Sequence, residues 1–420
     1  MATTDTKRVP RPRVALVADH FHPLELPPEA KINTDLALYL SSRGFHVTVF
    51  TSGKAENPGS DPNITVVGGS TEGSLRATYR LATLIAAEPV ETVIIMFNSN
   101  GFGHHPWISL LPPLLRRRFR FRGKIVAHFT NAETAPFGRV TRRMLRLIGD
   151  SGVRTVDWRI GGFADADRLV FYCSQHRDIL LSASPHLHPK SFISPVPLTV
   201  AVREPSPTAV ARIRQELNLG TDTKVVLFFG LIYPGKGIED LLASIAILNE
   251  RGHDSIAVII GGSGGVTSDE QWNKTCDEYY ERMKALTLDL RLSDRCRWIG
   301  HVDDTQLTNW FAISDVACLP FSGGIRSNNS TFAVCAAHGV PVVTTRWDGI
   351  DELFRSPGNG VRLASARDPS SLADELEHIL SDAAVRAAMS DQIRTLFDQW
   401  FTWDRLTGAL ALTADSSRLN

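Results

Sequence analysis

Short runs of β-branched and aromatic residues alternate with longer stretches of helical periodicity, and this alternation constrains the fold more than any other feature. Each run is apolar throughout, which is typical of a parallel strand buried on both faces. Helical stretches near 34–43 and 74–87 separate the runs of the first half. These runs are RVALVADH from 13, HVTVFT from 46, TVIIMF from 92 and KIVAHF from 124. The pattern predicts βαβ units and an α/β fold with a parallel sheet.

A second series of the same kind begins at KVVLFFG (224). It continues through IAVIIGG (256), CRWIG (296), DVACLP (315) and PVVTT (341). Because 420 residues exceed one ordinary hydrophobic core, we expect two Rossmann-like lobes facing a cleft. The proline- and serine-rich stretch before the second series predicts a hinge near 195–208. The expected domains are therefore residues 1–197, residues 198–398 and a last aromatic-rich helix in 399–420.

Charge and cysteine content exclude several classes of protein. Lys plus Arg and Asp plus Glu each number 45, so no global field attracts nucleic acid, and an anionic ligand needs a local site. The cysteines form no close pair, which argues against disulfides and zinc and favours a reducing compartment. No apolar segment is long enough to predict a membrane span, so we expect a cytoplasmic protein. The five cysteines are Cys173, Cys276, Cys296, Cys318 and Cys335.

One candidate phosphate site is FFGLIYPGKGIEDLL, a strand, a glycine-rich loop and a helix. The loop holds Gly230, Gly235, Lys236 and Gly237. Glycines let the backbone approach a ligand, the helix start offers free N–H groups, and Lys236 adds a positive charge. The pattern fits a diphosphate site, and it fits equally a tight turn with a solvated lysine.

A second candidate is LPFSGGIRSNNSTFAVCAA, where a strand leads through a flexible turn to an apolar helix. Its polar residues exceed what one helix cap needs, which favours an anion or sugar site. The guanidinium of Arg326 in the turn is suited to bind a phosphate oxygen. The alternative interpretation is that Arg326 is a solvent-exposed loop residue. The polar residues are Ser327, Asn328, Asn329, Ser330 and Thr331.

A third glycine-rich strand exit is IIGGSGG, which contains Gly262. Ligands of open parallel sheets bind outside the carboxyl ends of the strands. We therefore expect the three loops to converge on one crevice.

Together these motifs resemble the second lobe of retaining glycosyltransferases of family 4, which have the GT-B fold. The resemblance rests on the loop at Gly230–Gly237, the exit at Gly262, WIGHVDDTQLTNWFAISDVACLPF (298–321), and AAHGVPVVTT followed by DGIDE. The first lobe resembles the first lobe of the same family in the strings RVALVADHFHP, RGFHVTVFT, KIVAHF and ADRLVFYCS. The string WFTWDRL is similar to the family's closing helix, which crosses back to lobe one.

The resemblance implies a nucleotide-diphosphate sugar donor bound by lobe two, an acceptor bound by lobe one, and transfer in the cleft with retention of configuration. Lys236 matches the lysine at the donor diphosphate, and His128 matches the histidine at the donor sugar. Helix-start amides at Asn329 and Ser330 match those that take phosphate oxygens. Among the matching strings, His301 and Val302 fall at the expected donor site. No metal and no cofactor beyond the co-substrate are expected.

The sequence also departs from the family pattern. The two glutamates usual around this helix are replaced by Arg326 and Val334, and the usual arginine after the strand glycine is Leu231. We hypothesise that Arg326 compensates at the diphosphate, which indicates a divergent branch. Two alternatives stay open: a degenerate nucleotide-sugar-binding protein, and a nucleotide-sugar epimerase or hydrolase.

The remaining candidates concern the acceptor and possible metal or surface sites. His104, His105 and Glu29 are the candidate acceptor contacts, and we expect a small-molecule acceptor in natural-product biosynthesis. The triplet Asp165–Ala166–Asp167 is interpreted as a turn rather than a metal site. The run RRRFRFRGK (116–124) is interpreted as a solvated helix end, although its interleaved aromatics also fit a membrane or RNA contact. Whether the chain forms a homodimer is left open.

Overall fold

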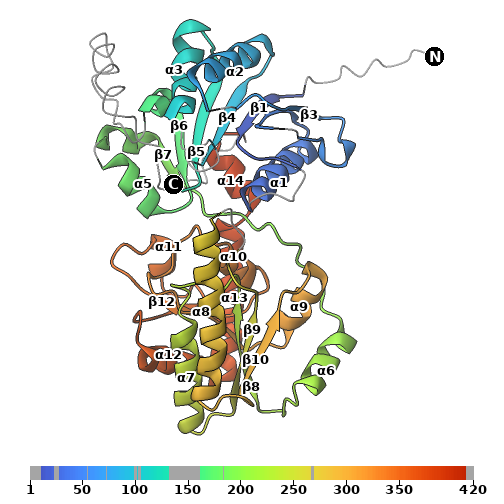
Figure 1. Cartoon of the computed structure of the whole chain (residues 1–420), viewed down its shortest axis with the longest axis vertical. Helices are drawn as coiled ribbons and strands as arrows, with labels where there is room; N and C mark the ends of the chain where they lie inside the picture. The colour runs from blue at the N-terminus through green and yellow to red at the C-terminus, as the bar shows by residue number, and fades with distance from the viewer. Residues whose placement is uncertain are drawn as a thin grey trace, which may run out of the picture. The chain divides into compact units, whose positions relative to one another are not determined.

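A computed structural model gives the structure of the chain (Figure 1). It describes residues 11–22, 28–53, 55–71, 73–98, 102, 106–131, 161–182, 184–265 and 269–412. The chain divides into two compact units. The N-terminal unit comprises Met1–Ser194 and Trp403–Asn420, and the C-terminal unit comprises Pro195–Thr402.

The N-terminal unit is built on a parallel sheet of seven strands. Their order is β3-β2-β1-β4-β5-β6-β7. The chain adds β2 and β3 on one side of β1 and then β4 to β7 on its other side. The inner strands β1, β4 and β5 are almost fully buried, as their continuous apolar runs predict. The strands are β1 (Arg13–Ala18), β2 (His46–Phe50), β3 (Ile64–Val67), β4 (Thr92–Phe97), β5 (Lys124–Phe129), β6 (Arg168–Phe171) and β7 (Ser191–Ile193).

Helices cover this sheet and join its parallel strands. The last helix of the chain belongs here, because Leu406, Ala409 and Leu410 are buried in the same core as the strand residues Val14 and Leu16. Figure 1 shows this helix, in red, near the blue first helix of the unit. The helices are α1 (Pro28–Ser42), α2 (Leu75–Ala87), α3 (Leu111–Pro113), α5 (Ser174–Leu181) and α14 (Trp403–Ala409).

The C-terminal unit is a parallel sheet of six strands in the order β10-β9-β8-β11-β12-β13. The order reverses direction between β8 and β11, so the loops after these two strands open to opposite sides of a topological switch point. The strands are β8 (Lys224–Phe229), β9 (Ser255–Ile260), β10 (Cys296–Gly300), β11 (Val316–Leu319), β12 (Val342–Thr345) and β13 (Val361–Ala364).

Eight helices are described around this second sheet. Five of them begin at an Asp or Asn whose side chain accepts a backbone N–H of the first turn, which satisfies donors that a helix start leaves free. The helices are α6 (Pro207–Glu216), α7 (Ile238–Glu250), α8 (Glu270–Asp289), α9 (Asp304–Ala312), α10 (Ser330–Ala337), α11 (Glu352–Arg355), α12 (Pro369–Leu380) and α13 (Ala383–Trp400).

The α/β class and the two Rossmann-like sheets predicted from the sequence are confirmed. All five cysteines are buried. Among the described helices, none combines the length and the apolar character that crossing a bilayer requires.

Candidate nucleotide-sugar site

Four loops of the C-terminal unit meet at the carboxyl ends of β8, β9, β10 and β11. The loop after β8 pairs with the loop after β9, because Ile232 N–H donates to the Gly262 carbonyl at 2.9 Å. It also meets the loop after β11, where the Ser322 N–H donates to the Gly235 carbonyl at 3.0 Å. The end of β10 joins them through the Gly261 N–H and the Gly300 carbonyl, at 2.9 Å. The three glycine-rich exits of the sequence analysis therefore converge at one edge of the sheet.

The glycines of these loops are required by close backbone packing. Gly237 has φ +72°, and a Cβ there would overlap the carbonyl oxygen of Pro320. Gly261 has φ +139°, and a Cβ there would overlap the carbonyl oxygen of Gly230. A Cβ on Gly262, in contrast, would meet no atom within 4 Å. The backbone is thus tightly packed beneath the loops and open at Gly262.

Lys236 is the buried cation of this site. Its side chain is only 6% exposed, and its Nζ lies 4.7 Å from the centre of the Tyr233 ring and 4.9 Å from that of Phe321. No described acidic group forms an ion pair with it. Burial lowers the pKa of Lys236 to about 8, so the ammonium form still predominates at neutral pH. A charged amine held only by two aromatic faces is suited to receive an anion.

Arg326 lies on the opposite loop of the same edge. Its guanidinium lies 4.7 Å from the centre of the Trp347 ring and passes beside Gly323. Its buried Nε has no hydrogen-bond partner among the described residues. Trp347 is itself fixed, because its Nε1–H donates to the Ile325 carbonyl at 2.9 Å. Within the part of the chain that the structure describes, no acidic side chain pairs with the stacked, half-buried Arg326.

The helix start predicted around Asn329 is present, but several of its polar groups are used within the protein. The Asn329 side chain accepts the Phe332 N–H at 2.9 Å and so caps α10. Ser327 is buried, and both its N–H and its hydroxyl donate to Asp351, at 2.9 and 3.0 Å. Asn328 is half-buried and Ser330 is exposed. The backbone N–H groups of the first turn, rather than the Ser327 and Asn329 side chains, are the groups suited to an anion.

The other predicted donor residues line the same edge. Gly230 follows β8 and lies against Thr331 of α10, where a Cβ would approach the threonine hydroxyl. His301 is exposed and Val302 half-buried, directly after β10. Val334, at one of the two glutamate positions, is buried in the core at 4% exposure. Leu231, which replaces the arginine of the family pattern, is 42% exposed.

His128 belongs to the other unit, on β5 between Met96 and Val170. It is fully buried, and neither ring nitrogen has a hydrogen-bond partner among the described residues. Burial lowers the pKa of His128 to about 3, so the imidazole is neutral at any physiological pH. The ring packs edge-on against Tyr172, 4.4 Å between centres. His128 is thus suited to a neutral hydrogen bond and not to ionic contact.

Polar residues that the sequence analysis did not select gather at the carboxyl ends of β1, β4 and β5. A narrow pocket there is lined by Asp19, Asn33, Asn98 and Thr130, and the first three are buried. The candidate acceptor residues His104 and His105 lie outside the described residues, as does the side chain of Glu29 in α1. Their predicted role stays a prediction.

Two sequence motifs have structural explanations within the N-terminal unit. Asp165 forms an ion pair with Arg117, at 3.1 Å. Asp167 pairs with Arg116 and accepts the Ile125 N–H at 2.7 Å. These contacts fix the turn before β6. Among the described residues, no group of three or more acidic, histidine or cysteine side chains is arranged to hold a metal ion.

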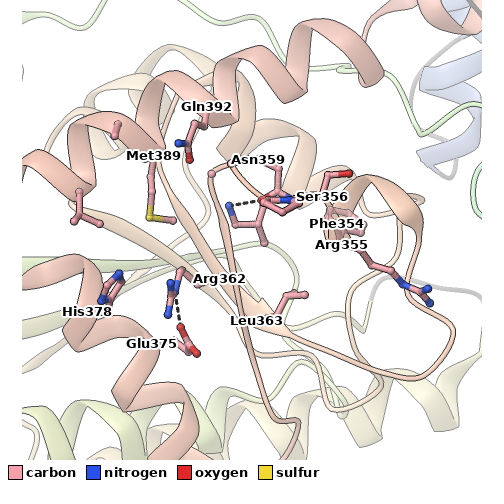
Figure 2. A pocket seen from close by; sticks show the side chains of 16 residues that line it. Phe354, Arg355, Ser356, Asn359, Arg362, Leu363, Glu375, His378, Met389 and Gln392 are labelled. Carbon is pink, nitrogen blue, oxygen red and sulfur yellow. Dashed lines mark hydrogen bonds and ion pairs between the residues drawn. The ribbon is translucent and has the colours of Figure 1, made fainter.

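A cavity of about 500 Å³ lies elsewhere in the C-terminal unit (Figure 2). It is lined by the loop before β13 and by residues of β13, α12 and α13. Arg362 is paired with Glu375 there, and Asn359 donates to the Leu353 carbonyl at 3.0 Å. Because its loop residues precede the amino end of β13, this cavity is separate from the strand-exit loops.

Trp347 and Asp351 are the contributors that the sequence analysis missed, together with the rings of Tyr233 and Phe321. A Cβ on Gly349 would overlap the Trp347 ring, which gives the glycine of DGIDE a packing role. Glu352 of the same turn is exposed, and its neighbour Asp351 is the buried carboxylate. No local signal in the sequence marks Trp347 or Asp351, because each acts on a residue more than 20 positions away.

Comparison with known proteins agrees with this geometry. Residues 210–396 match the family described as Glycosyl transferases group 1. The chain is 26% identical over 441 residues to a D-inositol 3-phosphate glycosyltransferase of Acidothermus cellulolyticus, covering 96% of this chain and 90% of that protein. It is 30% identical over 192 residues to the protein of that name from Corynebacterium jeikeium, covering 44% and 42% of the two chains. The match spans less than two thirds of this relative's length. The same holds for the D-inositol 3-phosphate glycosyltransferase of Xylanimonas cellulosilytica, of which the match covers 63%.

Solved structures show the same fold. A sucrose-phosphate synthase from Thermosynechococcus elongatus matches with a TM-score of 0.63 at 18% identity, covering 96% of this chain and 97% of the other. Anabaena HepE in complex with UDP matches with a TM-score of 0.67 at 15% identity, covering 96% and 100%. The two Rossmann-like units thus have the GT-B fold.

Proposed function

We propose that the protein is a glycosyltransferase and that the strand-exit loops of its C-terminal unit bind the diphosphate of a nucleotide-sugar donor. The observation that carries this proposal is Lys236. A lysine that is 6% exposed, still cationic at neutral pH and unpaired with any described acid costs folding energy. An anionic ligand at the convergent loops offsets that cost. The match to Glycosyl transferases group 1 over residues 210–396 supports a sugar donor as this ligand.

The chemistry follows from charge development on the leaving group. In the proposed reaction, the bond between the anomeric carbon and the diphosphate oxygen breaks, and the acceptor hydroxyl oxygen bonds to the same carbon with retention of configuration. The acceptor proton passes to the departing phosphate oxygen, so no separate carboxylate base is needed. Lys236, Arg326 and the first-turn amides of α10 stabilise the diphosphate as its negative charge grows. Each charged hydrogen bond contributes roughly 1.5 to 3 kcal/mol.

Two side chains therefore supply the positive charge that the leaving group needs, and the proposal includes neither a metal nor a resident cofactor. Arg326 stands where the family pattern has a glutamate, and Val334 where it has a second one. The buried, core-packed Val334 supports assignment to a divergent branch with its own sugar contacts.

For the acceptor, we propose a small molecule bound by the N-terminal unit, with a natural-product role. The names of curated relatives, which include D-inositol 3-phosphate, support a small acceptor. Five buried cysteines without a close pair in the sequence support a reducing, cytoplasmic compartment.

The test is a panel of UDP-, GDP- and TDP-sugars, assayed for slow hydrolysis of the donor and for thermal stabilisation by the free nucleotides. We expect one base to stabilise the protein and its sugar donors to be hydrolysed. A Lys236→Met variant should lose both effects while remaining folded. Binding without any turnover, even with candidate acceptors present, would favour the degenerate nucleotide-sugar-binding protein, and no binding by any nucleotide would refute the proposal.

A further inference from the structure

The cavity of about 500 Å³ in the C-terminal unit lies at the free edge of the sheet. Strand β13 is the last in the strand order, so only one of its edges is paired, with β12. The cavity is lined by residues 361–363 of β13 and by residues of α12 and α13. Figure 2 shows Arg362 between Met389 of α13 and Glu375 of α12. The unpaired edge of β13 therefore faces an open space between two helices.

Hydrogen bonds at both ends of β13 show which of its backbone groups point away from β12. The carbonyls of Gly360 and Ala364 accept the first N–H of β12 and the N–H directly after β12, at 3.2 and 2.9 Å. Backbone groups alternate in direction along a strand. Val361 and Leu363 therefore direct their N–H and carbonyl groups to the free edge.

The protein caps the ends of this free edge and leaves its centre open. The Val361 N–H donates to the Asn359 side chain at 2.9 Å, and the Ser365 N–H donates to the Ser371 hydroxyl at 2.9 Å. Among the described residues, none bonds the Val361 carbonyl, the Leu363 N–H or the Leu363 carbonyl. These three groups form an acceptor, donor, acceptor series. Because the flanking N–H groups are capped, an added β-strand would gain few further bonds, and the series is suited to a small ligand.

The walls of the cavity suit a flat and largely apolar ligand. Met389 is 7% exposed, and Val385 and Leu363 are half-buried. Arg362 is paired with Glu375, so its flat guanidinium is suited to stack on a ring rather than to bind an anion. The volume also falls in the range of small-molecule sites, about 300 to 1,000 Å³.

We propose that this cavity binds the adenine base of a nucleoside or nucleotide. The Watson–Crick edge of adenine offers an N–H donor, a ring-nitrogen acceptor and a C–H group, in that order. Each meets a complementary group when it is aligned with the Val361 carbonyl, the Leu363 N–H and the Leu363 carbonyl. In the same alignment, guanine, cytosine and uracil each place an acceptor against a backbone carbonyl, which is unfavourable. The edge of β13 therefore favours adenine over the other bases.

A second hollow of about 210 Å³ continues this cavity along α13. The two share the loop 356–359 and the side chain of Gln392. The amides of Gln392 and Gln399 in the second hollow are suited to the hydroxyl groups of a ribose. The proposed site requires no diphosphate, which distinguishes it from the anion site at Lys236.

The test is calorimetric titration of the full-length protein with adenosine and with inosine, which has a similar shape but exchanges the donor and the acceptor of this edge. We expect saturable binding of adenosine and more than about tenfold weaker binding of inosine. Leu363→Pro removes the N–H donor and should weaken adenosine binding about tenfold. The ladder to β12 is kept, because this N–H points to the free edge, and urea unfolding checks that the variant is folded.

A matched pair of variants on α13 tests the location. Ala388→Phe places a ring in the cavity and should abolish adenosine binding, whereas Ala387→Phe changes an exposed neighbour outside the lining and should leave it unchanged. Lys236→Met should bind adenosine with unchanged affinity, so the result is independent of the donor site. No adenosine binding by the folded protein, equal binding of inosine, or equal losses in the two alanine variants would overturn the proposal. Loss of adenosine binding in Lys236→Met but not in Ala388→Phe would place the base at the strand-exit loops and would also overturn it.

Discussion

Each unit buries one basic side chain at or after a central strand, and the two side chains differ in charge at neutral pH. His128 stands near the end of a central strand in the N-terminal unit, and Lys236 follows a central strand in the C-terminal unit. Neither has a hydrogen-bond or ion-pair partner among the described residues. Burial depresses both pKa values, to about 3 for His128 and about 8 for Lys236. At neutral pH, therefore, one is neutral and the other is a cation.

This contrast separates two chemistries on similar sheets. The C-terminal unit holds a charge ready for an anion, with Arg326 as a second cation. In the N-terminal unit the buried imidazole is neutral, and the buried polar side chains at the strand ends include the Asp19 carboxyl group as well as the amides of Asn33 and Asn98. The same α/β scaffold thus holds a buried cation at the strand-exit loops of one unit and a neutral imidazole within the sheet of the other.

Replacing Lys236 by Met tests whether its buried charge binds the diphosphate. This change has the largest expected effect on affinity. Affinity for a nucleoside diphosphate should fall about 100-fold, since roughly 3 kcal/mol of charge-assisted bonding is lost. Stability should rise by about 1 to 3 kcal/mol, because a buried ammonium no longer has to be desolvated. Calorimetric titration and urea unfolding measure the two effects. Loss of stability together with affinity would mean that Lys236 is structural.

The backbone beneath the anion site gives the next largest effect. Gly237→Ala should lower the free energy of unfolding by about 2 to 3 kcal/mol, because φ is +72° and the new methyl group meets the Pro320 carbonyl. Gly262→Ala is the control from a neighbouring loop, with open space around it, and should change stability by less than about 0.5 kcal/mol. Equal effects of the two changes in urea unfolding would show that the loops are not packed as described.

The pH dependence of the free energy of unfolding tests whether His128 is neutral in the folded protein. Because the folded-state pKa of His128 is about 3 and the unfolded value is near 6.5, the unfolded chain binds more protons between these limits. The His128 contribution is therefore present above about pH 6.5 and is lost as pH falls, by about 2 kcal/mol near pH 5. His128→Leu should remove this part of the pH dependence in urea unfolding. An unchanged pH slope would show that His128 titrates normally.

Arg326→Ala should have the smallest effect, about a tenfold loss of diphosphate affinity, because Arg326 is only half-buried and solvent partly screens its charge. Unfolding free energy should change by less than about 0.5 kcal/mol. Arg355→Ala, an exposed arginine of the cavity in Figure 2, is the matched control and should not affect binding. If the two variants weaken binding equally, Arg326 is not at the diphosphate.

The sequence predicts the central elements of both units better than their margins. Continuous apolar runs identified β1, β4, β5, β8 and β9, because buried parallel strands carry no polar alternation. The edge strands β3, β7 and β13 were missed, since they are three or four residues long and only partly buried. Their pairing depends on the neighbouring strand more than on their own composition.

The site shows the same division. Glycines, Lys236 and the polar helix start are local signals, and the sequence analysis found them. Trp347 beneath Arg326 and Asp351 beneath Ser327 act across more than 20 positions of the chain, so no local pattern reveals them. Likewise, only the packed structure shows that Lys236 is buried between Tyr233 and Phe321.

The measurement that tests the central claim most directly is proton uptake on binding a nucleoside diphosphate, obtained by calorimetric titration in buffers of different ionisation enthalpy. Near pH 8, where about half of the free Lys236 is neutral, the account predicts uptake of a fraction of a proton. That uptake should vanish at about pH 6.5 and in Lys236→Met. Binding with the same proton uptake in the Lys236→Met variant would contradict the claim that this lysine holds the diphosphate.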